Sequence, residues 1–147
     1  MAFSPDKSKL AVGGDDCKVA IYDVSTGSPL VEVKRGATVF AVAFSNDGAI
    51  LAVGGDDCKV ALIDASTGST SPRGVVRSGK IRALAFSPVD PDLFAVGNGD
   101  SIVSLCTTTG ETRFDHTRGK KHDAVAFAPD GQILAAGGFD KTVVLLD

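Results

Sequence analysis

The sequence predicts an all-β protein built from about four copies of one four-stranded unit, and three observations support this prediction. A short block recurs at nearly constant spacing, each unit contains several short β-branched and aromatic runs, and tight-turn residues separate those runs. No window shows a sustained apolar period of 3.6 residues, so we expect no helix. The fold class is therefore a repeated, purely β architecture.

The repeat is the strongest of these observations. The block Ala-Phe-Ser-Pro-Asp and its variants occur four times, at residues 2–6, 43–47, 85–88 and 126–130. The phenylalanines of successive copies are 41, 42 and 41 residues apart. A second block, residues 10–20, is repeated residue for residue at 51–61, and weaker copies begin at Phe94 and Leu134. A period of roughly 40–45 residues with four strands is typical of β-propeller blades.

The second unit illustrates how the strands follow one another. We expect its strands at residues 39–44, 50–53 and 59–64, with a weaker fourth strand near 75–76. The segments between them carry turn chemistry: Asn46-Asp47-Gly48, Gly54-Gly55-Asp56-Asp57 and Ser66-Thr67-Gly68. Each unit is therefore expected to fold as one antiparallel sheet.

The units are expected to stack as the blades of one domain, residues 1–147, with blade boundaries near 1–35, 36–77, 78–118 and 119–147. The inner strands are almost continuously apolar, as in sheets buried on both faces, and small residues such as Ala41 and Ala52 suit close stacking. The last unit stops after its third strand, so we expect an incomplete ring. Three explanations stay open: a fragment of a longer propeller, two copies pairing into an eight-bladed ring, or four blades closing alone.

On these motifs the chain resembles the WD-repeat family over nearly its whole length. Each unit carries a form of Ala-Phe-Ser-Pro-Asp-Gly, then Leu-Ala-x-Gly-x-x-Asp, then a strand that closes near an aspartate. Residues 13–23 also resemble blades of the actin-interacting WD-repeat proteins that work with cofilin. The resemblance implies a non-catalytic scaffold that uses no cofactor and mediates protein–protein interaction, with other proteins or peptides as partners.

The chain departs from the family pattern at several fixed positions. The tryptophan before the terminal aspartate is replaced by Tyr22, Ile63, Cys106 and Leu146, and the Gly-His pair is missing. The turn aspartate is kept in all four units, as Asp16, Asp57, Asp100 and Asp140. Nine residues before the motif phenylalanine, where the family usually has histidine, the chain has Arg35, Arg77 and Arg118.

These arginines predict a structural network. In the family, the aspartate and histidine join a buried hydrogen-bond network, and we expect arginine–aspartate pairs in its place in the second to fourth blades. A guanidinium can bind a carboxylate through two hydrogen bonds and keeps its charge. The alternative is a basic arc that holds phosphate or an acidic peptide. We favour the structural interpretation because the arginines recur in fixed register with the aspartates.

Few other residues suggest chemistry. His116 and His122 are interpreted as part of one connection, where the positive charges of Arg118, Lys120 and Lys121 would repel a cation, so we expect no metal site. The loop with Arg118, Lys120 and Lys121 is instead a candidate contact for an acidic partner. The paired aspartates and residues 68–71 are interpreted as a turn and a solvated loop, so no catalytic residue is predicted.

Composition narrows the function classes further. The formal net charge of −3 gives no global attraction to nucleic acid or to an anionic membrane. Three cysteines without close pairs favour a reducing, intracellular and hence cytoplasmic setting, and no apolar run reaches the roughly 18 residues of a membrane helix. Two alternatives to a scaffold remain: part of a propeller enzyme of the quinone-cofactor dehydrogenase type, or a phosphate- or phosphoinositide-binding propeller.

Overall fold

The computed structural model describes residues 1–117, 122–139 and 141–147, and these residues form 15 strands in four antiparallel sheets. The first sheet contains β1 (Ala2–Phe3), β2 (Lys9–Gly13), β3 (Lys18–Asp23) and β4 (Pro29–Lys34). The second contains β5 (Val39–Phe44), β6 (Ile50–Gly55), β7 (Lys59–Asp64) and β8 (Val75–Val76). The third contains β9 (Ile81–Phe86), β10 (Leu93–Asn98), β11 (Ile102–Thr107) and β12 (Thr112–Thr117). The fourth contains β13 (His122–Phe127), β14 (Leu134–Gly138) and β15 (Val143–Leu146).

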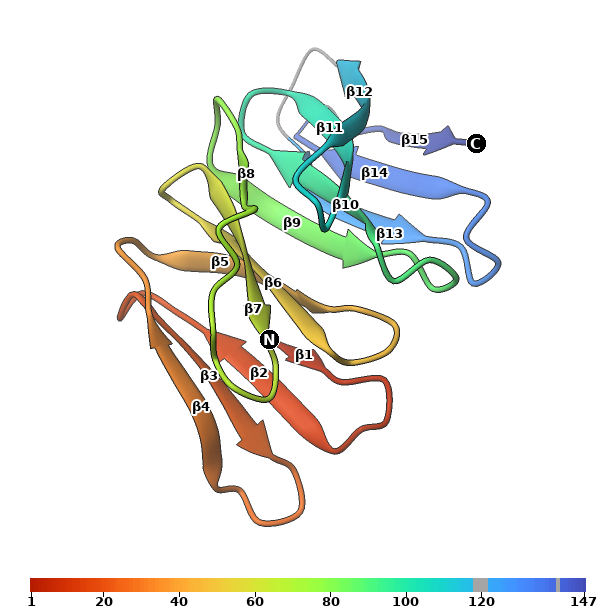
Figure 1. The fold of residues 1–147 in the computed structure, drawn as a ribbon. Coiled ribbons are helices and arrows are strands. Elements are labelled where there is room, and N and C mark those ends of the chain that lie inside the picture. Colours follow the sequence, from red (N-terminus) through yellow and green to blue (C-terminus); the bar gives the residue numbers. More distant parts are fainter. Residues whose placement is uncertain (118–121, 140) are drawn as a thin grey trace.

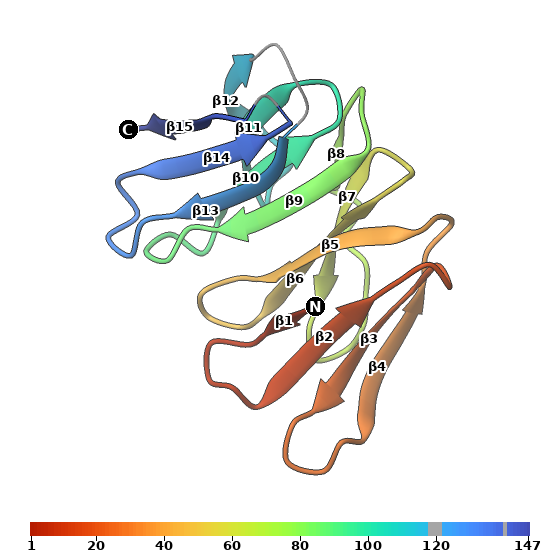
Figure 2. The same ribbon diagram turned by 180° about the vertical axis from the view of Figure 1, so that it is seen from behind.

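The four sheets follow one another in an open arc. Figures 1 and 2 show the first strands of successive sheets next to one another, with β5 beside β9 and β9 beside β13. The described sheets do not close into a ring, and the predicted all-β propeller architecture is confirmed. Within these ranges no helix has the length and hydropathy needed to cross a membrane.

The core lies between the sheets, in three layers. Ile21, Leu51 and Ile63 are buried between the first and second sheets. Leu62, Ile81 and Phe94 are buried between the second and third, where the rings of Phe86 and Phe94 are 5.4 Å apart. Val103, Leu134 and Ala136 fill the space between the third and fourth. Neighbouring residues of β7, Leu62 and Ile63, serve different layers, which explains why this strand is apolar on both faces.

A buried serine organises the turn after the first strand of the first two sheets. Ser45, which is fully buried, accepts a hydrogen bond from the Ile50 amide at 3.0 Å and donates one to Asp47 at 2.5 Å. Ser4 makes the same contacts with the Lys9 amide (2.9 Å) and Asp6 (2.6 Å). The Phe-Ser-x-Asp block is therefore the sequence of a serine–aspartate turn. The hydrogen bond from Ser4, together with those from Ser8, lowers the pKa of Asp6 to about 2.

Glycines at the end of the second strand allow neighbouring strands to come close. A Cβ on Gly13 would overlap Val39 of the next sheet, and a Cβ on the equivalent Gly54 would overlap Ile81. A Cβ on Gly55 would overlap the carbonyl oxygen of Thr38 within its own sheet. The first glycine of the Gly-Gly pair is therefore a packing feature of the stacked sheets.

Candidate functional site: the turn network and an outer groove

Arg35 and Asp57, two residues of the proposed arginine–aspartate network, form an ion pair. Arg35 Nη2 donates to Asp57 Oδ2 at 2.9 Å, and the two side chains are 12% and 25% exposed. The same nitrogen is 3.4 Å from the Lys59 carbonyl oxygen, while Asp57 Oδ1 accepts the Lys59 amide at 3.2 Å. The Arg35 amide donates to the Cys17 carbonyl at 2.7 Å. Arg35 thus closes one sheet with its backbone and contacts the next with its side chain.

The third sheet is different, because Arg77 does not contact Asp100. Arg77 Nη2 lies 2.7 Å from Cys106 Sγ and 2.8 Å from Thr112 Oγ1, and its buried Nε has no partner among the described residues. Asp100 instead accepts a short hydrogen bond from Ser78 Oγ. Cys106, at the family's tryptophan position, offers Arg77 a sulfur acceptor, whereas Ile63 at the equivalent position of the second sheet offers none. Burial raises the pKa of the Cys106 thiol, and Arg77 acts in the opposite direction.

The other predicted site residues have mixed outcomes. Asp16 Oδ1 accepts the Lys18 amide at 3.2 Å, which is a turn contact. Arg118, Lys120, Lys121 and Asp140 lie outside the described residues, so their proposed roles stay predictions. His116 and His122 were expected within a connection, but they lie in β12 and β13, because the strands extend to the connection from both sides. The His116 ring stacks on Phe114 with centroids 6.3 Å apart.

The arrangement of the arginines bears on the basic-arc alternative. Arg35 is paired with a carboxylate, and Arg77 is directed at a thiol and a hydroxyl. An incoming phosphate would have to displace these contacts. The described part of the network therefore favours a role in holding the blades together, which we keep as a proposal.

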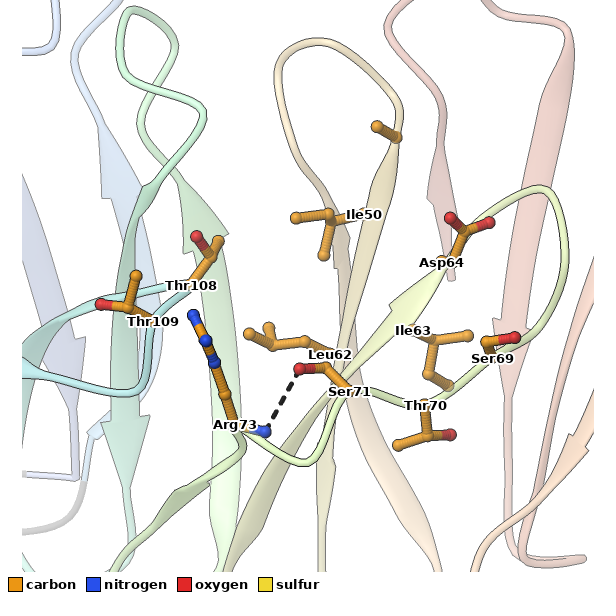
Figure 3. Close-up of a pocket in the computed structure, with 11 residues that line it drawn as sticks. Ile50, Leu62, Ile63, Asp64, Ser69, Thr70, Ser71, Arg73, Thr108 and Thr109 are labelled. Atoms are coloured by element: carbon orange, nitrogen blue, oxygen red, sulfur yellow. Dashed lines mark hydrogen bonds between the residues drawn. The ribbon is translucent and has the colours of Figure 1, made fainter.

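A groove opens on the outer side of the second and third sheets, with a cavity volume of about 460 Å³ (Figure 3). Its lining combines apolar side chains, hydroxyl groups and two charges. The lining residues are Ala49, Ile50, Leu62, Ile63, Asp64, Ser69, Thr70, Ser71, Arg73, Thr108 and Thr109. We call this site the outer groove.

The outer groove exists because the outer strand of the second sheet is interrupted. β8 pairs with β7 at Val75 and Val76, and a separate bridge joins Thr70 to Ile63. Between these two stretches the pairing shifts by two residues, so that the segment around Pro72 bulges away from β7. Proline has no amide hydrogen for the sheet and commonly ends a strand. Such a bulge redirects side chains, here that of Arg73.

The two charges of the outer groove differ in their surroundings. Asp64 Oδ1 accepts hydrogen bonds from the Ser66 hydroxyl (2.6 Å) and from the amides of Ser66 (2.9 Å) and Thr67 (2.8 Å). These bonds, that of the Ser66 hydroxyl above all, hold the pKa of Asp64 well below its usual range. Arg73 is exposed, and its guanidinium bonds to no described residue; only its amide does, to Ser71 Oγ at 3.2 Å. Figure 3 shows the guanidinium near Thr108 and Thr109, away from Asp64.

Sequence reasoning missed the outer groove. Residues 68–71 were expected to form a solvated loop, and Ser69 and Thr70 are indeed exposed, but the segment also bridges to β7 and lines the groove. The available signal was the run Ser69-Thr70-Ser71-Pro72, which has no apolar alternation where the outer strand should be. The contribution of Thr108 and Thr109 follows only from stacking of the third sheet.

Comparison with known proteins agrees with the geometry of the sheets. Residues 1–23 and 115–147 match the family model described as "WD domain, G-beta repeat". Residues 30–88 match the model described as "Anaphase-promoting complex subunit 4 WD40 domain". A search of curated proteins found no match. The likeness to actin-interacting proteins is not tested by these matches and stays a prediction.

Proposed function

Because the chain belongs to the WD-repeat family, we propose that it is a non-catalytic platform that binds other proteins or peptides. Domains of this family mediate protein–protein interaction through turns and strands that a stacked core holds in place. One of the two matched models is named for a subunit of a complex, which supports the same assignment. We include an intracellular, reducing setting in the proposal, since Cys17, Cys58 and Cys106 are all free thiols.

The observation that best supports this function is the outer groove. β7, which lines the groove, is anchored in the core on both faces: Leu62 and Ile63 are 2% and 1% exposed and belong to two different core layers. A preformed, largely apolar depression on a rigid scaffold loses little conformational entropy when a partner binds. Loops and strand edges supported in this way are where binding usually resides.

Peptide display on the purified, immobilised chain tests the proposal. We expect selection from a random library to enrich related sequences that bind the folded chain and lose binding when urea unfolds it. Enrichment of nothing above an unrelated control protein would contradict the proposal. So would an intrinsic enzymatic activity that a single substitution abolishes.

We also propose that the chain self-associates through its outermost sheet faces. On β15, Val143 and Leu145 are 69% and 66% exposed. Val144 and Leu146 point the other way and pack against the core layer between the third and fourth sheets. Apolar sheet faces of this kind favour contact with another sheet. Light scattering would give a mass near twice 15.0 kDa if two copies pair. A strictly monomeric mass at high concentration would contradict self-association.

A further inference from the structure

We propose that the outer groove binds an extended acidic segment of a partner protein, with an apolar side chain over Ile50 and Leu62 and a carboxylate at Arg73. This inference rests on the proposed platform function and adds the chemistry of the partner. It follows from three properties of the groove: a fixed apolar floor, a guanidinium without a partner at one end, and a carboxylate already occupied at the other.

The apolar floor provides the first contact. Leu62 is buried in the core layer between the second and third sheets, and Ile50 packs against that layer while remaining half-buried. Ala49, also on the lining, is exposed. Leu62 is only 2% exposed, so a leucine-sized side chain placed here covers mainly the apolar surface of Ile50 and Ala49, and removing that surface from water favours binding.

Arg73 provides the second contact. Its guanidinium has no hydrogen-bond or ion-pair partner among the described residues, so a carboxylate can bind it without displacing an internal contact. The backbone of Arg73 passes close to the third sheet, since a Cβ added to Gly110 would lie 3.3 Å from the Arg73 carbonyl oxygen. Hydrogen bonds between a guanidinium and a carboxylate are among the stronger ones in proteins, particularly when bidentate.

Asp64 gives the groove a direction. Its carboxylate is charged and already accepts three hydrogen bonds from its own turn, so it repels an acidic group at that end. Alternate residues of an extended chain point to the same side, about 7 Å apart. We therefore assign to the groove a segment of the form Leu-x-Glu, with its leucine over Ile50 and its glutamate at Arg73.

Two synthetic peptide pools test this inference: short fluorescein-labelled peptides with a fixed Leu-x-Glu core, and a matched pool with Leu-x-Gln. In fluorescence polarisation with the full chain, we expect the Glu pool to bind about tenfold more tightly at low salt. Added salt should reduce that preference, because the guanidinium is exposed to solvent.

Three variants assign the effect to the groove. Arg73→Gln should remove the preference for the Glu pool, and circular dichroism should show an unchanged fold, because the guanidinium has no internal partner. Lys34→Gln, which removes an exposed cation on β4 outside the groove lining, should keep the preference. Ala49→Phe fills the groove from an exposed position and should weaken binding of both pools.

The outcomes separate the two proposals. Equal affinities for the two pools, or a Glu preference that survives Arg73→Gln, would overturn the groove assignment. Peptides that display selects but that bind independently of Arg73 and Ala49 would also overturn it, and would leave the platform function standing. If display and both pools yield no binding at all, the platform function fails together with the groove.

Discussion

Individual carboxylates in this chain act mainly as acceptors for their own turns. Asp6, Asp23, Asp47 and Asp64 each accept hydrogen bonds from a serine hydroxyl and from a nearby backbone amide, and each has a lowered pKa with the serine as the largest cause. The ionised form of each carboxylate is therefore the one that the folded chain prefers. The repeat thus uses charge locally, to fix turn geometry.

The acid sensitivity of folding should reflect this preference, and Asp6 offers the clearest test. Its pKa is about 2 in the folded chain against an ordinary value of 3.8, so its contribution to stability is present above about pH 4 and is lost as the pH falls toward 2. We expect Asp6→Asn to flatten the decrease of the urea midpoint between about pH 5 and pH 2.5. Lys34→Gln, at an exposed position of β4, is the control and should leave the slope unchanged.

The Arg35–Asp57 pair should be worth more than an exposed ion pair. A double-mutant cycle with Arg35→Met and Asp57→Asn is expected to give a coupling of about 1–2 kcal/mol in the free energy of unfolding, because both groups are mostly shielded from water. The same cycle at Lys18 and Glu32, which are 39% and 52% exposed, should give less than about 1 kcal/mol. Equal coupling energies for the two pairs would show that the Arg35–Asp57 pair stabilises the fold no more than an exposed ion pair does.

At the scale of elements, the same sequence is used in two different surroundings. Gly14 and Gly55 are equivalent in the identical runs 10–20 and 51–61. β5 pairs with β6 as far as Gly55, whereas β1 pairs with β2 only at Ala2 and Phe3. As a result Gly55 faces the Thr38 carbonyl, while a Cβ on Gly14 would find only Asp16 Oδ1, at 3.7 Å. A Cβ would therefore meet backbone atoms at Gly55 and a side-chain oxygen at Gly14.

Alanine at these two positions should therefore have unequal effects. We expect Gly55→Ala to lower the free energy of unfolding by about 1–3 kcal/mol, because the backbone of Thr38 would have to move. Gly14→Ala should change it by less than about 0.5 kcal/mol. Urea titrations of both variants measure these changes in the free energy of unfolding. Similar decreases for the two variants would mean that Gly14, like Gly55, lies against backbone atoms.

At the scale of the whole molecule, the sheets bury one another and leave apolar faces at the ends of the arc. The fourth sheet packs Val144 and Leu146 inward and presents Val143 and Leu145 outward. The two outward side chains lie on one face of β15, as alternation along a strand requires. In the inner sheets, the equivalent apolar face is buried against a neighbouring sheet. On β15, at the end of the arc, it is exposed.

A charge on that face should reduce self-association without unfolding the chain. Leu145→Lys places an ammonium group at a position that is 66% exposed, so the free energy of unfolding should change by less than about 0.5 kcal/mol. Sedimentation velocity should show a shift toward the monomer relative to the unaltered chain. Lys7→Gln, at an exposed turn of the first sheet, should leave the distribution unchanged.

The architecture could be predicted from the sequence because its determinants are local and periodic. Phe-Ser-x-Asp turns, Gly-Gly pairs and short, almost continuously apolar strands each act within a few residues, and they recur at one period. The partner of Arg77 could not be predicted in this way, because it depends on which atom Cys106 presents across the sheet. The outer groove likewise requires both an interrupted strand in one sheet and the placement of Thr109 from the next.

The hydrogen-bonded strand pairs of this chain each lie within a single sheet, and this affects how the chain can gain or lose residues. Every ladder begins and ends within one period of the sequence, so duplication or loss of a gene segment that encodes one period leaves the remaining ladders intact. Only the two sheet faces that come into contact at the new junction must be complementary to each other. The identical runs at 10–20 and 51–61 form the same strand pairing in two neighbouring sheets, as this modular arrangement requires.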